Sequence, residues 1–213
     1  NKANNVWDAL SLTDSNDNLL IDNDFSHCTN TCAKLWTSSR NKLLNNNLSY
    51  GIRIDRDKGE VHARDSTSVL IESGSNDNYF YKNNITHGGD GVFIRVLNGW
   101  ISERNIFVEN DTSYANNNCV ESWSPGNTYV RNIAERGSYG FWLGGSDHTV
   151  LIGNKANYSG LASGYHNAGE PGFGNAGIAI AGFASANTLI AGNETIGNNG
   201  AGIAFRGKVP KTG

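Results

Sequence analysis

A short asparagine signature recurs along this chain and constrains its fold more than any other feature. Each copy has an asparagine, two mostly apolar residues, two variable residues and a second asparagine, as in Asn78-Tyr79-Phe80-Tyr81-Lys82-Asn83. Degenerate copies are expected as well, including one that opens at Trp100 and closes at Asn105. The closing asparagines are then expected at positions 23, 46, 83, 105, 132, 154 and 193. Their spacing indicates a base period of about 22 residues interrupted by insertions, which predicts a solenoid of stacked coils.

Each coil is expected to contain three short strands. The signature follows a short alternating segment that usually opens with glycine, such as Gly140-Phe141-Trp142-Leu143, and alternation of this kind indicates a strand with one face inside. Asparagines at the same turn of successive coils are expected to stack as a hydrogen-bonded ladder. We therefore predict an all-β parallel β-helix of about eight coils, with three loop insertions near residues 50–68, 107–117 and 157–175.

Residues 1–213 are expected to form one β-helix domain that is an excerpt of a longer solenoid. The opening residues Asn1-Lys2-Ala3-Asn4 repeat Asn154-Lys155-Ala156-Asn157, so the chain is expected to start partway through a coil. Open solenoid ends expose strand edges, and flanking coils or a cap would cover them.

Composition excludes several classes of partner. The net charge of −3 offers no basic face for nucleic acid, and no run of 18 apolar residues is present to span a membrane. Cys28 and Cys32 are four residues apart, so a small disulfide and two reduced thiols both remain open.

No metal site is expected from the sequence, and calcium is the one cofactor it leaves open. Histidine and cysteine lack the spacing of a zinc site. Asp14, Asp17, Asp22 and Asp24 could supply the oxygen ligands that calcium prefers, although aspartates at turns need no ion.

Charged residues interrupt the first-strand positions of three neighbouring coils. The insertions are expected to overhang this sheet, where Glu72, Arg95 and Glu121 are taken as outward because burying an unpaired charge is costly. Arg95 would stand one coil from each glutamate, and the two glutamates would be ~9.6 Å apart at the backbone. That separation suits the acid and base of an inverting glycosidase, and it suits a structural Glu–Arg–Glu ion ladder equally well.

Further residues near this column suit a carbohydrate ligand. Phe93, Trp123 and Trp142 could stack on sugar rings, or could pack beneath the overhanging loops. Arg53 in the first insertion could bind a uronic acid carboxylate, although the mixed charges of this insertion favour an ordinary solvated loop. His87 and Asp90 could transfer a proton, or could belong to an ordinary polar turn.

The Gly-Ile-x-Ile strands, as at Gly177-Ile178-Ala179-Ile180, followed by Asn-x-x-x-x-Asn resemble the repeats of the pectate-lyase-like superfamily. The resemblance covers nearly the whole chain. It implies a right-handed parallel β-helix and places the protein among polysaccharide lyases, glycoside hydrolases, alginate epimerases and NosD-like repeat proteins. The epimerase motif Asp-Pro-His-Asp is missing here, which counts against that branch.

The leading hypothesis is a secreted or cell-surface protein that binds or acts on a polysaccharide across the first-strand sheet. As an enzyme it would be a hydrolase or lyase, with Glu121 and Glu72 as acid and base and Arg95 orienting them or binding a uronate. The alternative is a non-catalytic β-helix that serves as a sugar-binding or structural module of a surface protein. A metal-delivery protein of the NosD type ranks lowest, because the chain lacks methionine. The oligomeric state is left open.

Overall fold

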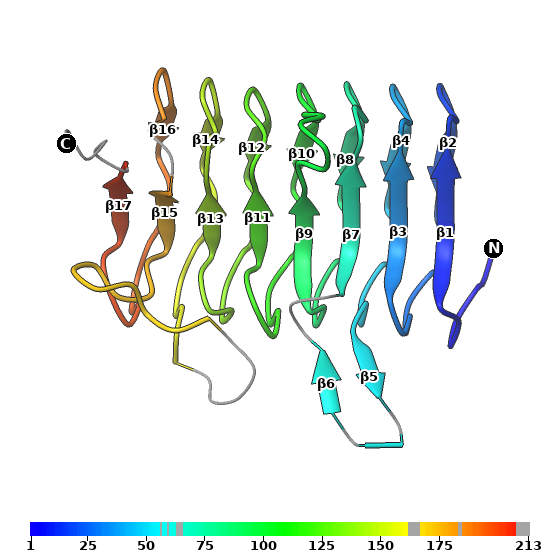
Figure 1. The fold of residues 1–213 in the computed structure, drawn as a ribbon, viewed down its shortest axis with the longest axis horizontal. Helices are drawn as coiled ribbons and strands as arrows, with labels where there is room; N and C mark the ends of the chain where they lie inside the picture. The colour runs from blue at the N-terminus through cyan, green and yellow to red at the C-terminus, as the bar shows by residue number, and fades with distance from the viewer. Residues whose placement is uncertain (56, 59, 63–65, 162–166, 183–184, 208–213) are drawn as a thin grey trace.

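Two of the three strands that the repeat predicts in each coil form parallel sheets, which run the length of the molecule. The computed structural model describes residues 1–213 except 56, 59, 63–65, 162–166, 183–184 and 208–213. The larger sheet, here sheet 1, has eight strands whose order follows the sequence (Figure 1): β1 (Asp8–Thr13), β3 (Thr31–Trp36), β7 (Thr67–Glu72), β9 (Asp90–Ile94), β11 (Val120–Ser122), β13 (Phe141–Leu143), β15 (Ile178–Ala181) and β17 (Ile203–Arg206).

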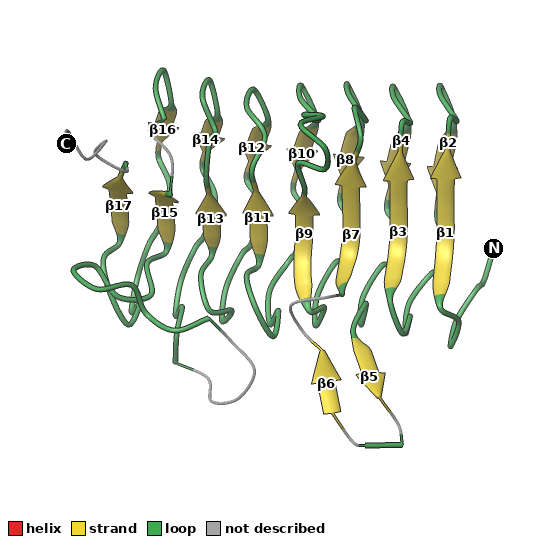
Figure 2. Ribbon diagram, viewed as in Figure 1, coloured by secondary structure: helices red, strands yellow, loops and turns green. Residues whose placement is uncertain are grey.

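Sheet 2 has seven strands, one following each of the sheet 1 strands β1 to β15: β2 (Leu19–Ile21), β4 (Lys42–Leu44), β8 (Tyr79–Tyr81), β10 (Ile106–Val108), β12 (Thr128–Val130), β14 (Val150–Ile152) and β16 (Leu189–Ala191). The third side of each coil is a single parallel bridge, in a series that runs from Lys2 and Asp24 to Glu194. Figure 2 shows strands and loops and no helix over the described residues. Each strand pairs with its equivalent one coil away, so the molecule is a parallel β-helix.

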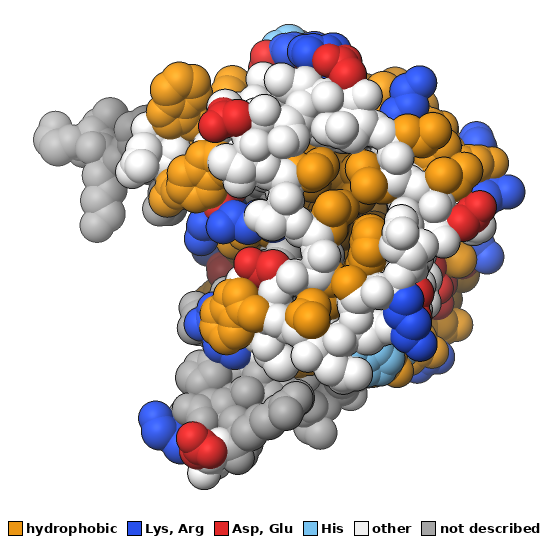
Figure 3. All heavy atoms as spheres, turned by 90° about the vertical axis from the view of Figure 1, so that its right-hand side faces the viewer, with side chains coloured by type: hydrophobic (Ala, Val, Ile, Leu, Met, Phe, Trp, Pro, Cys, Tyr) orange, Lys and Arg blue, Asp and Glu red, His pale blue; other side chains and the backbone are white. Residues whose placement is uncertain are grey.

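Inward side chains of successive coils stack to form the core. Phe80, Phe107 and Tyr129 occupy the same position of β8, β10 and β12, with ring centroids 4.7 and 5.3 Å apart. Figure 3 looks along the stack from its first coil and shows apolar side chains gathered in the middle of the section. The core is therefore a continuous column along the helix axis.

Buried asparagines form two ladders, one at each end of the sheet 2 strands. At each rung, one side-chain oxygen accepts hydrogen bonds from both the backbone N–H and the side-chain amide of the preceding asparagine, as from Asn46 to Asn83 at 2.9 and 3.1 Å. The closing ladder joins Asn23, Asn46, Asn83, Asn110, Asn132, Asn154 and Asn193. The opening ladder joins Asn18, Asn41, Asn78, Asn105 and Asn127. The expected asparagine ladder is confirmed.

Asn105 was expected to close a signature, and this assignment is wrong. Asn105 opens β10, and Asn110 closes the same copy. The extra residues of this coil therefore lie between β9 and β10, and not at 107–117. They stand at the carboxyl end of the sheet 1 strands, where Leu97 and Trp100 form an antiparallel bridge.

The other two insertions lie near their expected positions. The first contains an antiparallel hairpin of β5 (Arg53–Asp55) and β6 (Glu60–His62). The hairpin and the third insertion extend from the same lower edge of the solenoid (Figure 1). This is the amino-terminal end of the sheet 1 strands, so two of the three insertions flank the outward face of sheet 1 from one side. The described residues include no helix with the length and apolarity that a membrane-spanning helix requires.

Candidate functional site

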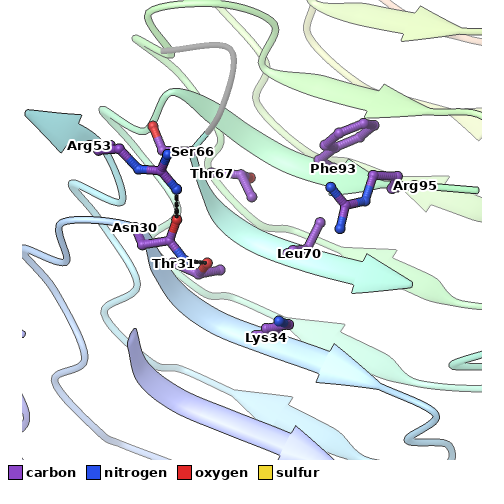
Figure 4. Close-up of a pocket in the computed structure, with 9 residues that line it drawn as sticks. All are labelled: Asn30, Thr31, Lys34, Arg53, Ser66, Thr67, Leu70, Phe93 and Arg95. Carbon is purple, nitrogen blue, oxygen red and sulfur yellow. Dashed lines mark hydrogen bonds between the residues drawn. The ribbon is translucent and has the colours of Figure 1, made fainter. Parts of the chain in front are cut away.

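A cavity of about 360 Å³ opens on the outward face of sheet 1, over β3, β7 and β9. The start of the first insertion closes one side of it. The described residues that line it come from these strands, the turns before them and β5: Asn30, Thr31, Lys34, Arg53, Ser66, Thr67, Leu70, Phe93 and Arg95. Figure 4 shows the basic side chains around the space above Thr67 and Leu70.

Three of the described lining residues are cations, and none is acidic. Arg53 donates a hydrogen bond from Nη2 to Oδ1 of Asn30 at 2.6 Å, and its guanidinium stacks 4.9 Å from the ring centroid of Trp7. Lys34 lies 5.3 Å above the Trp36 ring. These contacts hold Arg53 and Lys34 at the edge of the cavity, where their charges attract anionic groups.

Arg95 and Glu72 form an ion pair at the floor of the same face. Arg95 follows Ile94, which pairs with Ile71, so the two side chains are neighbours in adjacent coils. Arg95 donates from Nε to Oε2 of Glu72 at 2.6 Å and from Nη2 to the same oxygen. The Lys34 ammonium lies 3.9 Å from the other oxygen, Oε1. The Glu72 side chain is fully buried whereas that of Arg95 is 40 % exposed, so the glutamate holds the arginine and does not itself face the cavity.

Glu121 does not align with Arg95. Glu121 pairs in register with Phe93 of β9 on one side and with Trp142 of β13 on the other. Phe93 precedes Arg95 by two residues, so Glu121 lies two positions away from the level of Arg95. The neighbour of Arg95 in the next coil is Trp123, whose backbone N–H donates a hydrogen bond to Ile94 O. The expected Glu–Arg–Glu column is thus absent from the described sheet, and only its Glu72–Arg95 half forms.

Glu121 and Asp90 instead both accept hydrogen bonds from Asn118. The backbone N–H of Asn118 donates to Oδ1 of Asp90 at 2.9 Å, and its side-chain amide donates to Oε2 of Glu121 at 2.7 Å. Trp123 Nε1 donates to the second oxygen of Glu121 at 2.7 Å, and Asn117 donates to Asp90 at 2.8 Å. Two carboxyl groups therefore stand close together, each held by nitrogen donors.

Both carboxyl groups of this pair resist ionisation. Burial raises the pKa of Asp90 well above its usual range, and the charge of Glu121 raises it further. Burial also raises the pKa of Glu121, against the opposing effect of the donors from Trp123 and Asn118. A carboxyl group that keeps its proton to higher pH can act as a general acid.

The acid pair lies next to the cationic cavity. Asp90 pairs in register with Thr67, and Glu121 pairs with Phe93. Thr67 and Phe93 both line the cavity, so each acid stands one coil, ~4.8 Å, beyond a lining residue. Sheet 1 thus carries cations on its outward face over β3 to β9 and the half-buried Glu121 on β11, with Asp90 buried at the start of β9.

The two candidate tryptophans are half-buried beside Glu121. A Cβ on Gly144 would lie 2.3 Å from Trp123 Cζ3, so the indole occupies the space that the glycine leaves. Trp142 packs edge-on against Tyr139, with centroids 4.7 Å apart. Their role as sugar-stacking residues remains a proposal.

His87 lies outside this site. Its ring stacks between Tyr50 and Tyr114, at centroid distances of 4.7 and 5.0 Å, along the third side of the solenoid. Burial lowers the pKa of His87. Within the described residues no hydrogen bond joins it to Asp90, whose bonds go to Asn117 and Asn118.

Lys34, Asn118 and Trp7 belong to this region and were not singled out from the sequence. Lys34 could have been identified from the sequence, because it is the lone charge in the otherwise uncharged strand Thr31–Trp36. Asn118 and Trp7 could not be identified in this way, since asparagine is abundant at every turn and Trp7 precedes its strand.

In the described part of the chain, no three histidine, cysteine, aspartate or glutamate side chains come together as a metal site. Of the aspartates considered for calcium, Asp17 pairs with Arg40 at 2.8 Å and Asp24 accepts from Ser26 at 2.7 Å. Cys28 and Cys32 are buried free thiols.

No family model matches the chain, and no curated protein matches it. A solved structure does: the periplasmic alginate epimerase AlgG, in its T265N mutant, with a TM-score of 0.58 and 11% sequence identity. The match covers 93% of this chain and 48% of the epimerase, so the chain spans about half the length of that protein. The chain therefore shares the parallel β-helix fold with this epimerase.

Proposed function

We propose that this protein binds an anionic polysaccharide across the outward face of sheet 1, with acidic groups of the polymer on Lys34, Arg53 and Arg95. The observation that carries the proposal is the convergence of three cations on one cavity whose described lining has no acidic residue. A polymer of this kind is met outside the cytoplasm, so we propose a secreted or cell-surface location.

The ion pair with Glu72 prepares Arg95 for such a ligand. Nε and Nη2 of Arg95 both bond to Glu72, which fixes the plane of the guanidinium and leaves Nη1 for a carboxylate or sulfate. Because Glu72 is fully buried, we propose that it positions Arg95 and does not act as an acid or base.

We further propose that Glu121 is the general acid of a polymer-cleaving reaction, with its burial keeping its proton affinity high. Hydrolysis and elimination both require a proton for the departing sugar oxygen, and a raised carboxyl pKa serves that step. The cations would offset the charge of the polymer's acidic group beside the cleaved bond. Phe93, Trp123 and Trp142 would then flank the bound sugar.

Binding is tested with polygalacturonate, alginate and a neutral glucan by calorimetry. Wild-type protein is expected to prefer the anionic polymers, and the preference should weaken as salt is raised. Lys34→Ala and Arg53→Ala should each weaken binding by about tenfold, the value of one charge-assisted contact. Lys42→Ala is the matched control, because Lys42 is exposed on β4 in the other sheet. Equal affinity for charged and neutral polymers would overturn the proposal.

A non-catalytic binding module is the second candidate, and the closed Glu72–Arg95 pair favours it, because that pair removes one expected acid from the cavity. New reducing ends without absorbance at 235 nm would indicate a hydrolase, and new reducing ends together with that absorbance would indicate a lyase. Turnover that falls at least about a hundredfold in Glu121→Gln, with binding retained, supports the enzyme. Binding without any turnover in the wild-type protein supports the module.

A further inference from the structure

A second cavity of about 360 Å³ lies at the carboxyl end of the sheet 1 strands. The extra residues between β9 and β10 build one wall, and the turns that follow β3 and β7 build the other. The described lining is Thr37, Ser73, Gly74, Asn76, Asn98, Gly99, Trp100 and Ile101, here called the corner cavity. In contrast to the cationic cavity, none of these residues carries a charge.

A tight turn presents Trp100 at this corner. Trp100 N–H donates to Leu97 O at 3.0 Å, and the two central residues, Asn98 and Gly99, have φ of 54° and 79°. Positive φ at both central positions is the geometry that an Asn-Gly pair favours in a two-residue hairpin. The turn therefore holds the tryptophan in a defined place.

The Trp100 side chain contacts the preceding coil and is nevertheless largely exposed. It is 64% exposed, the largest exposed fraction among the described large apolar residues. Behind it, a Cβ on Gly74 would lie 3.5 Å from Trp100 Cε3, so the ring rests against the backbone of the preceding coil. Exposing this much indole to water is unfavourable, and a ligand with an apolar face would cover it.

Polar groups surround the ring. Asn76 Oδ1 accepts a hydrogen bond from Glu103 N–H at 2.8 Å, which orients the amide. Within the described residues, the Asn76 amide NH₂ and the hydroxyls of Thr37 and Ser73 make no hydrogen bond. These groups can donate to and accept from hydroxyls of a ligand.

We propose that the corner cavity is a second carbohydrate subsite, which takes an uncharged sugar ring stacked on Trp100 and hydrogen-bonded by Asn76. The inference rests on the proposed function only in taking carbohydrate as the class of ligand. An apolar ring face and several hydroxyls are what a neutral sugar offers, and the uncharged lining gives an acidic group no partner.

The two cavities lie along the same strand. Leu70 lines the cationic cavity and Ser73 lines the corner cavity, a separation of three residues or ~10 Å in an extended chain. One polymer that follows β7 can therefore reach both, with an acidic sugar at Arg95 and a neutral sugar at Trp100. A heteropolysaccharide that contains both kinds of residue satisfies this arrangement better than a uniformly charged polymer.

The test uses calorimetry with neutral hexasaccharides of glucose, mannose or galactose. Trp100→Ala is expected to weaken binding by about tenfold or more, Trp100→Phe less, and Asn76→Ala by several-fold. Phe205→Ala is the control and should bind as the wild-type protein does, because Phe205 is 59% exposed on β17 at the far end of the solenoid.

The two proposals fail separately in this experiment. A wild-type protein that binds the neutral hexasaccharides but shows no preference for anionic polymers would overturn only the cationic cavity. No neutral binding by the wild-type protein, or equal binding by Trp100→Ala, would overturn the corner subsite.

Discussion

Arg95 is anchored to Glu72, a fully buried carboxylate in the preceding coil, through hydrogen bonds from Nε at 2.6 Å and from Nη2. A buried charge of this kind is costly unless it is paired, and Lys34 adds a second cation 3.9 Å from the other oxygen. The pair explains how the outward face of an otherwise apolar strand can carry a fixed positive charge. It also separates the two glutamates, since Glu72 serves Arg95 whereas Glu121 belongs to a different pair.

Glu72→Gln is expected to lower the free energy of unfolding by about 1–3 kcal/mol, less than for a fully buried pair because Arg95 is partly exposed. Loosening Arg95 should also weaken anionic polymer binding. Urea unfolding measures the first effect and calorimetry the second. Asp17→Asn removes a solvent-exposed pair with Arg40 and should lower the free energy of unfolding much less than Glu72→Gln does. Equal losses in the two variants would contradict the role given to Glu72.

The acid pair predicts a pH dependence of stability with a definite sign. The pKa values of Asp90 and Glu121 are raised in the folded protein, so between the ordinary carboxyl pKa and the raised value the folded state binds more protons than the unfolded state. The stabilisation is complete below the ordinary values, about pH 4, and is lost as pH rises through the raised ones. Urea unfolding from about pH 4 to pH 8 should show this loss, and Glu121→Gln should make the profile flatter. A profile that rises with pH equally in both proteins would contradict the assignment.

Trp123→Phe should raise the pKa of Glu121 further. The indole N–H donates to Glu121 Oε1 at 2.7 Å and favours the ionised form, and phenylalanine has no such donor. The titration of the Glu121 side-chain carbon, followed by nuclear magnetic resonance, measures the change. Trp142→Phe is the control, because Trp142 lies in register with Glu121 in the next coil but its ring packs edge-on against Tyr139. The same titration curve in Trp123→Phe and wild type would show that the bond has no influence.

Asn110→Ala tests the closing ladder and the corrected register together. Asn110 is 1% exposed. Its Oδ1 accepts a hydrogen bond from the Asn83 amide, and its own amide donates to Asn132 Oδ1 and to Phe80 O. Its loss leaves buried backbone groups unpaired and should lower the free energy of unfolding by about 2–4 kcal/mol. Asn84→Ala, at an exposed bridge residue next to the ladder, should cost less than about 1 kcal/mol. A small effect at Asn110 in urea unfolding would contradict its place as a ladder rung.

The solenoid could be predicted from the sequence because its repeat is short and occurs in many copies. Several coils carry the same asparagines and alternating strands, so the ladder, the parallel sheets and the positions of two insertions follow from the period alone. A misread copy at Asn105 left the fold prediction intact, since the neighbouring coils determine the same architecture. The lone charges Glu72 and Arg95 were likewise visible as interruptions of apolar strands.

The tertiary structure decided where the irregular residues go. Two asparagines, Asn105 and Asn110, can each end a signature, and only the pairing of Phe107 between Phe80 and Tyr129 selects the second. In sheet 1, a shift of two residues keeps a side chain on the same face while it changes its neighbours, so the pattern could not distinguish Glu121 beside Arg95 from Glu121 beside Phe93. The sequence by itself determined the coil. Contacts between coils determined the partners of Arg95 and Asp90, because those partners lie 23 to 28 positions away and their register depends on the length of every insertion between them. Glu121, in contrast, is held by Asn118 and Trp123 of its own coil.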